Sequence, residues 1–142
     1  MTTTVINLKG RIHEYGPRLE HAPAELVYVG RANSRGRDRG GWDLAQHALH
    51  NPPKNSLAQL GAPEASVAAY VRHLLDRPDL LDQARALRGK TLGCWCAPTL
   101  CHAHAIAWYA DGLDTSQLAE RASDLEAAAS LAEQHLFNRL EA

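Results

Sequence analysis

Long hydrophobic runs and an excess of charge of either sign are both missing from this sequence of 142 residues. No apolar stretch approaches the roughly 20 residues that a membrane-spanning helix needs, which excludes a helical membrane protein. Lys and Arg number 15 and Asp and Glu number 16, so the net charge of -1 provides no overall attraction to nucleic acid. The first residues, "MTTTVINLKG", lack the basic start and apolar segment of a signal peptide, and we expect a cytoplasmic protein.

Sulfur is also scarce, and its placement is uneven. All three cysteines, Cys94, Cys96 and Cys101, lie within residues 89–112, "GKTLGCWCAPTLCHAHAIAWYADG", where two histidines follow directly. An odd number of cysteines, two of which are too close for a relaxed bridge, argues against a structural disulfide. The cluster is therefore the first candidate for a functional site.

The order of short β-branched segments and helical patterns indicates the fold class. We expect strands at 5–9, 25–30 and 90–96, and helices at 42–50, 64–77, 78–88, 101–111 and from 114 onward. Prolines make the segment 51–63 irregular in this interpretation. Strands that alternate with helices predict an α/β fold with a small, mostly parallel sheet flanked by helices.

The end of the chain is predicted to be a unit of its own. We divide the chain into an α/β domain at 1–113 and a long C-terminal helix at 114–142. Apolar residues recur in that helix at steps of three and four, at Leu118, Ala122, Leu125, Ala129, Ala132 and Leu136. Such a seam can pack on the domain or on a partner, including a second copy of this chain in a homodimer.

The spacing of the cysteines predicts that their sulfur atoms converge. Cys94 and Cys96 stand two apart on a predicted strand, so both side chains point to the same face. The turn "APTL" then brings Cys101 to the start of a helix, where the helix dipole favours a thiolate. His102 or His104 can complete a set of three sulfurs and one imidazole, which are ligands of a tetrahedral zinc site.

The sequence leaves three alternatives to zinc open. The C-x-C-x4-C-H spacing is not that of a zinc finger. Three thiolates with an open position can instead hold a four-iron iron-sulfur cluster. The cysteines can also be small buried hydrophobic residues, since free cysteine is common in cores, and Cys101 can be a catalytic thiol that needs no metal.

A loop rich in glycine and arginine, "VGRANSRGRDRGGW", is the second candidate site. It follows a predicted strand and precedes a predicted helix, the order in which α/β proteins present backbone amides to an anion. Its arginines can hold phosphate, although it matches neither a P-loop nor G-x-G-x-x-G. Gly30 and Arg31 follow a strand end, as the cysteine loop does, and ligands of parallel sheets gather at such ends. Asn51 can add an amide, and Trp42 can stack on a base or lie in the core.

The motif "GKTLGCWCAPTLCH" resembles the signature of domain-of-unknown-function family 4326, found in bacteria and their phages. The resemblance extends over roughly residues 4–112 and includes "VINLK", "VYVGR" and "NPP". The residues that it carries over are Gly30, Arg31, Trp42, Asn51, Pro52, Lys90, Cys94, Trp95, Cys96, Pro98, Cys101 and His102. It implies a site without naming a reaction, and it favours His102 over His104 as the functional histidine. The arginines from Arg35 to Arg39 and the helix after Asp114 depart from the family pattern.

These observations together predict a zinc site formed by Cys94, Cys96, Cys101 and His102. Next to it we expect an anion pocket formed by Gly30, Arg31, Trp42 and Asn51, whose ligand is a nucleotide or a nucleic-acid end. In an enzyme, Cys101 and His102 are the expected catalytic residues, and hydrolysis or group transfer is the expected chemistry. One alternative is a non-enzymatic module in which zinc stabilises nucleic-acid or protein binding. Another is an interaction protein that pairs through its C-terminal helix.

Overall fold

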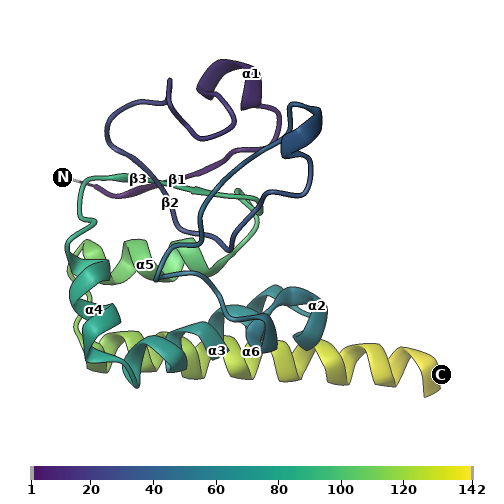
Figure 1. The fold of residues 1–142 in the computed structure, drawn as a ribbon. Coiled ribbons are helices and arrows are strands. Elements are labelled where there is room, and N and C mark those ends of the chain that lie inside the picture. The colour runs from purple at the N-terminus through teal and green to yellow at the C-terminus, as the bar shows by residue number, and fades with distance from the viewer. Residues whose placement is uncertain (1, 142) are drawn as a thin grey trace.

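A computed structural model describes residues 2–141 of the chain (Figure 1). Met1 of the predicted domain and Ala142 of the predicted C-terminal helix lie outside the described residues. Three short strands form one parallel sheet in the order β1-β3-β2. The strands are β1 (Thr4–Asn7), β2 (Leu26–Tyr28) and β3 (Thr91–Cys94).

Six α-helices and two short 3-10 turns surround or connect these strands. The helices are α1 (Ile12–Tyr15), α2 (Leu57–Leu60), α3 (Pro63–Leu75), α4 (Pro78–Arg85), α5 (His102–Ala110) and α6 (Thr115–Glu141), and the turns are η1 (Arg37–Arg39) and η2 (Pro53–Asn55). In Figure 1 the sheet has α1 and long loops on one side and α5, α4, α3 and α6 on the other. The predicted α/β class, with a small parallel sheet and a long C-terminal helix, is confirmed.

The two faces of the sheet bury different cores, because side chains alternate along each strand. The main core lies between the sheet and α3, α4 and α5, and it includes Leu92 and Cys94 of the central strand β3. A smaller second core lies under the loops on the other face and contains Leu8, Tyr15, Tyr28 and Leu44, with Trp42 and Trp95 packed against them. Cys94 therefore points toward the helices, whereas Trp95 packs under the loops.

Gly93 allows the loop after β1 to cross the central strand closely. A Cβ atom at Gly93 would lie 2.9 Å from Cδ1 of Leu8, whose side chain is fully buried in the second core. Glycine at this position is explained by that close approach, since its backbone φ is not positive.

The predicted helix at 42–50 is wrong. Leu44 instead forms an isolated antiparallel bridge with Asn33, and Leu49 is fully buried in the main core. The segment runs from the second core to the main core. An extended chain rises about 3.3 Å per residue, whereas a helix rises about 1.5 Å per residue. An extended segment therefore spans the distance between the two cores with fewer residues than a helix would need. Trp42, Ala45 and Leu49 have helical spacing, but Trp42 packs against the second core, Leu49 lies in the main core and Ala45 is exposed, so they do not form one helix face.

The first half of α6 packs against α3. Leu118 and Ala122 are fully buried, and Arg72 of α3 donates hydrogen bonds to Ser123 and Glu126 of α6 at 3.1 and 2.8 Å. Over the described residues, no helix combines the length and the apolar composition needed to cross a membrane.

Candidate functional site

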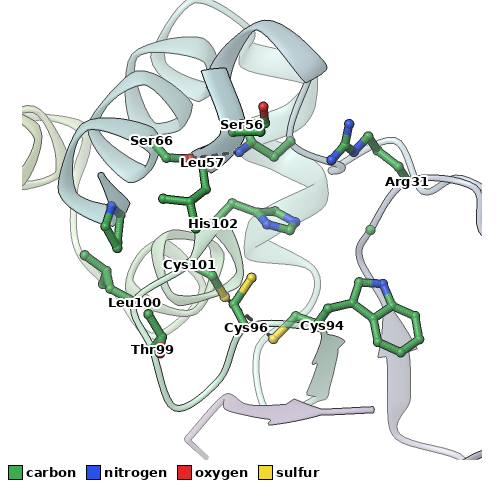
Figure 2. A pocket seen from close by; sticks show the side chains of 15 residues that line it. Arg31, Ser56, Leu57, Ser66, Cys94, Cys96, Thr99, Leu100, Cys101 and His102 are labelled. Atoms are coloured by element: carbon green, nitrogen blue, oxygen red, sulfur yellow. Dashed lines mark hydrogen bonds between the residues drawn. The ribbon is translucent and has the colours of Figure 1, made fainter. Parts of the chain in front are cut away.

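A cavity of about 210 Å³ opens at the carboxyl ends of β2 and β3, beside the start of α5 (Figure 2). Parallel sheets present strand ends and helix N-termini at the same edge, which is where their ligands bind. The residues that line this cavity are Gly30, Arg31, Asn51, Ser56, Leu57, Ala58, Pro63, Ser66, Cys94, Trp95, Cys96, Thr99, Leu100, Cys101 and His102. We call this cavity the cysteine pocket. All three cysteines line it, together with three of the four residues predicted to bind the ligand.

The three sulfur atoms gather on one side of the cysteine pocket, as Figure 2 shows. Cys94 at the end of β3 and Cys101 at the N-cap of α5 are both buried, with their Sγ atoms 3.6 Å apart. Cys96 comes from the loop between them, and its side chain is exposed at the rim. The sequence-based expectation that sulfur atoms from a strand end and a helix start converge matches this arrangement.

The charge within the cysteine group differs from the charge expected from the sequence. Hydrogen bonding from the Cys101 thiol lowers the pKa of Cys94 to about 6 and that of Cys96 to about 7. The pKa of Cys101 itself is raised, because its proton is held between these two sulfurs. The helix dipole was expected to make Cys101 the thiolate. The hydrogen bonds instead favour the proton on Cys101 and make Cys94 and Cys96 the more acidic thiols, of which Cys94 also donates to the backbone oxygen of Ile6 at 3.4 Å when it carries its proton.

Both predicted fourth ligands have other partners. His102 uses Nε2 for a 2.8 Å hydrogen bond to the backbone oxygen of Val29. Since a carbonyl only accepts, Nε2 carries the proton and Nδ1 is an acceptor. His104 accepts a 3.0 Å hydrogen bond at Nδ1 from the backbone N–H of Cys101, so it stabilises the start of α5. In Figure 2 the His102 ring points toward Arg31 and not toward the sulfur atoms.

Burial of His102 predicts a loss of stability in acid. Its pKa is lowered to about 4 because the ring is removed from water, against an ordinary value of 6.5. In the unfolded chain His102 is protonated below about pH 6.5, whereas in the folded chain it is protonated only below about pH 4. The free energy of unfolding therefore decreases as the pH drops from 6.5 to 4. We expect about 2 kcal/mol of unfolding free energy to be lost between pH 7 and pH 5, measured by urea denaturation of metal-free protein.

The matched variant for this prediction is His102→Gln, whose amide N–H can still donate to Val29. His47 and His73 also have pKa values lowered by burial, and Cys94 and Cys96 have pKa values lowered by hydrogen bonds, so all four make stability fall further with decreasing pH, in addition to the contribution of His102. The variant should therefore retain only that residual slope. An unchanged pH dependence in His102→Gln would rule out His102 as its source.

Tyr28 holds the loop that follows β2 and the loop that follows β3 in a fixed arrangement. Its hydroxyl donates a 2.6 Å hydrogen bond to the backbone oxygen of Arg31 and accepts a 3.0 Å bond from Nε1 of Trp95. A Cβ atom at Gly30 would collide with the hydroxyl and ring of Tyr28, so glycine is required there by close approach. Arg31, the next residue, is thereby held at the mouth of the cysteine pocket.

Asn51 presents a buried acceptor without a partner at the cysteine pocket. Its Nδ2 donates to the backbone oxygen of Asn55 at 3.1 Å and to Oγ of Ser66 at 3.3 Å. Ser66 donates in turn to the same Asn55 oxygen at 2.6 Å. These contacts fix which way the amide faces, and they leave Oδ1 of Asn51 buried with no hydrogen-bond partner among the described residues. Such an atom costs free energy unless a ligand or water donates to it.

Some predicted site residues do not reach the cysteine pocket. Trp42 lies in the second core, edge-to-face against Trp95 at a centroid distance of 5.4 Å, so it supports a lining residue without lining the cavity itself. Arg35 lines a separate hollow with residues 32–34, and Arg37 lines another beside Arg18. Of the arginines in the loop, Arg31 is the one that lines the cysteine pocket.

The sequence interpretation missed the wall formed by α2. Ser56, Leu57 and Ala58 line the cavity, in a segment that was expected to be irregular. A signal was available: Ser56 followed by Gln59 is the S-x-x-Q pattern of a helix start, and Oγ of Ser56 accepts a 3.3 Å bond from Gln59 N–H. No signal in the sequence links Ser66 to Asn51, because their contact joins residues on different elements.

The arrangement of sulfur atoms can be compared with a zinc centre. Tetrahedral zinc with Zn–S bonds of about 2.3 Å separates its sulfurs by about 3.8 Å, close to the 3.6 Å between Cys94 and Cys101. Within residues 2–141, no set of three or more His, Cys, Asp or Glu side chains has the arrangement of a ready-formed metal site. The two buried sulfurs are thus at a spacing that suits zinc, and Cys96 is the third thiol that lines the same cavity. His102 lies outside this group of donors, since its Nε2 is bonded to Val29.

The fold and site together define a small α/β protein with a cysteine-lined pocket at the carboxyl edge of a parallel sheet. The chain belongs to the family described as a domain of unknown function (DUF4326), whose family model matches residues 13–112, and the resemblance seen in the sequence is confirmed. The uncharacterized protein R718 of Acanthamoeba polyphaga mimivirus is 33% identical over 70 residues. That match covers 49% of this chain and 48% of the viral protein, so the chain spans about half the length of that relative. No solved structure gives a significant match.

Proposed function

We propose that the cysteine pocket binds the phosphate-bearing end of a nucleotide or nucleic acid beside a zinc ion held by Cys94, Cys96 and Cys101. The observation that carries this proposal is the convergence of the three sulfurs, Arg31 and the start of α5 on one cavity. When bound, zinc supplies a Lewis acid that polarises an oxygen of the substrate or lowers the pKa of a water. The reaction class that suits such a site is hydrolysis or group transfer.

An anionic ligand is favoured by two features of the pocket mouth. Arg31 is exposed but held by its backbone, so its guanidinium can fork onto a phosphate without reordering the loop. The N-terminus of α5, a helix of 9 residues, begins at the same cavity, and the positive end of its dipole lies there, although Cys101 and His104 cap its first N–H groups. Both groups attract negative charge, and the lining residues include no Asp or Glu; the acidic thiols of Cys94 and Cys96 lie in the same pocket and are the groups proposed to hold zinc.

The size of the cavity suggests that only part of the ligand is enclosed. Pockets for drug-sized ligands usually measure about 300 to 1,000 Å³, and this one is about 210 Å³. A terminal phosphate with its sugar, or a single base, is of the right size. The remainder of a nucleotide or strand would lie outside, along the loop that begins at Arg31.

The part of the ligand that lies next to its phosphate, inside the cavity, is expected to carry hydrogen-bond donors. Oδ1 of Asn51 and Nδ1 of His102 are both acceptors, because their companion nitrogens donate to the protein. With a pKa of about 4, His102 acts at neutral pH as a hydrogen-bond acceptor and not as a proton acceptor. Sugar hydroxyls and the amino or imino groups of a base are the donors that satisfy both atoms.

Arg31→Ala tests this proposal, with Arg35→Ala as the matched control. Both arginines are exposed and lie in the same loop, but Arg35 lines a different hollow. We expect Arg31→Ala to weaken binding of nucleoside 5′-monophosphates and of a short 5′-phosphorylated oligonucleotide about 10-fold, since a charge-assisted hydrogen bond contributes about 1.5 to 3 kcal/mol. Arg35→Ala should stay within about twofold. Isothermal titration calorimetry at fixed salt provides the affinities.

Equal losses of affinity in Arg31→Ala and Arg35→Ala would mean that the arginines act only through general charge attraction, which would contradict a specific pocket. A wild-type protein that binds none of these probes would refute the phosphate ligand directly. If binding survives but no probe is turned over in the presence of zinc, the protein is the non-enzymatic binding module, and the metal serves the fold alone.

A further inference from the structure

The two buried cysteines are in direct contact with each other. Sγ of Cys94 and Sγ of Cys101 lie 3.6 Å apart, and the two residues are only 2% and 5% exposed in the main core. A disulfide bond places its two sulfurs about 2.05 Å apart, so these atoms need to approach by about 1.5 Å. Rotations about the Cα–Cβ bonds of both residues can cover a distance of that size.

The loop that joins the two cysteines is held in place by Asn7. Its Nδ2 donates hydrogen bonds to the backbone oxygens of Trp95 and Ala97, at 3.2 and 2.9 Å. The start of α5 is fixed as well, because Nδ1 of His104 accepts the backbone N–H of Cys101 at 3.0 Å. The fold therefore keeps the two sulfurs together, which raises the effective concentration of one thiol at the other.

Small oxidants can reach this pair through the cysteine pocket. Cys94 and Cys101 both line the cavity, and the exposed residues Cys96 and Arg31 stand at its mouth (Figure 2). The cavity volume of about 210 Å³ is several times the roughly 30 Å³ that one water molecule takes up in the liquid. Hydrogen peroxide, which is only slightly larger than water, fits this space.

We propose that Cys94 and Cys101 form a reversible redox-modification site, where a hydroperoxide converts the two thiols to a disulfide. With hydrogen peroxide, the O–O bond breaks as one sulfur takes up OH to become a sulfenic acid, and the other oxygen leaves as water. The second thiol attacks that sulfur, the S–O bond breaks, and hydroxide leaves with the thiol proton as another water. The two thiols lose two electrons, and one hydrogen peroxide is reduced to two waters.

The bond is assigned to this pair because of the position of Cys96. Cys94 and Cys96 are separated by a single residue, which is too short a spacing for a relaxed bridge. Cys96 is exposed at the rim of the pocket, whereas Cys94 and Cys101 face each other inside the main core. The thiol of Cys96 therefore stays free when the other two sulfurs join.

The modification regulates metal binding, and this consequence rests on the proposed zinc site. A disulfide between Cys94 and Cys101 removes two of the three thiolates proposed to hold zinc. A metal bound through thiolates is lost when those sulfurs are no longer available. Zinc is therefore expected to leave as the disulfide forms and to bind again after reduction.

Peptide mapping of the full chain, freed of metal with a chelator and treated with hydrogen peroxide, tests the modification. After alkylation and digestion, we expect a peptide in which Cys94 is joined to Cys101 and a peptide with alkylated Cys96. Dithiothreitol should restore all three thiols. Cys96→Ser should form the same disulfide at an unchanged rate. Cys101→Ser is the matched variant that should form none, and serine is a good N-cap residue for α5.

Two kinds of result overturn the proposal. A wild-type disulfide that includes Cys96, or the loss of the disulfide in Cys96→Ser, overturns the assigned pair. Three alkylatable thiols after peroxide treatment, or buried thiols converted to sulfinic acid that dithiothreitol does not reverse, overturn the modification itself.

Zinc-loaded protein separates this proposal from the zinc site on which its consequence rests. Release of zinc as the disulfide forms, followed with a chromogenic chelator, is the expected result. A disulfide that forms in a protein without affinity for zinc contradicts only the zinc site. Zinc that binds and stays bound under peroxide, with all three thiols intact in the metal-free protein as well, contradicts only the modification.

Discussion

Replacing Cys101 by serine is expected to abolish zinc binding at the proposed site and, with it, the response of the protein's stability to a chelator. Cys101 is the shared neighbour in the sulfur group, 3.6 Å from Cys94 and hydrogen-bonded toward Cys96 as well. Zinc at 1,000 times its dissociation constant stabilises a folded chain by about 4 kcal/mol. Wild-type protein should lose about that much on chelation, whereas Cys101→Ser should lose almost nothing. Metal analysis of protein purified without oxygen, combined with denaturant unfolding, measures both effects.

His104→Gln is the control for this experiment. His104 accepts the Cys101 backbone N–H and is not expected to hold metal, and glutamine at this position can accept the same N–H, so the replacement should change stability by less than about 0.5 kcal/mol and leave the zinc content unchanged. Iron and visible colour in the wild-type protein would show that the same cysteines hold an iron-sulfur cluster and not zinc. Protein without any metal would contradict the metal proposal, and the thiols would remain as the reactive groups.

Tyr70→Ala is expected to cause the largest loss of stability among single substitutions near the cysteine pocket that do not involve metal. Tyr70 on α3 is fully buried, donates its hydroxyl to the backbone oxygen of Leu49, and packs edge-to-face on His102 with ring centroids 5.0 Å apart. Burial raises the pKa of its phenol, in accord with a hydroxyl shielded from water. Removing the ring should lower the free energy of unfolding by about 3 to 5 kcal/mol in urea denaturation.

Tyr70→Phe separates the hydrogen bond from the packing. It keeps the ring but leaves the buried oxygen of Leu49 without a donor, so a loss of about 1 to 3 kcal/mol is expected. Tyr109→Phe is the control, because Tyr109 on α5 is half-buried and has the Arg85 guanidinium over its ring, and its replacement should change stability by less than about 0.5 kcal/mol. Equal effects of Tyr70→Phe and Tyr109→Phe would contradict the role of the Leu49 bond.

Periodic patterns were enough to predict the three strands and the helices α3, α4, α5 and α6, but not α2. The stripe from Val67 to Leu75 predicted α3, and the β-branched and apolar residues around Leu92 predicted β3. Each of these patterns repeats over one element that packs on one core, and such patterns follow directly from helix and strand geometry. The segment 42–50 does not pack on a single core. Its apolar residues serve two different cores, and a helical spacing between them arose without a helix.

The sequence by itself placed the three cysteines within eight positions, between a strand end and a helix start. Seven extended residues can span more than about 20 Å, so the 3.6 Å between the sulfurs of Cys94 and Cys101 depends on the turn that joins them. The sequence also placed Gly30 and Arg31 at a strand end. Tertiary structure alone decided the rest of the cysteine pocket. The pairing of β2 beside β3 brings Arg31 to the cysteines, and the meeting of α3 with η2 orients Asn51 through Ser66. The contact of His102 with Val29 also depends on the fold, since it joins residues 73 positions apart, and no local pattern records a bond between segments that distant.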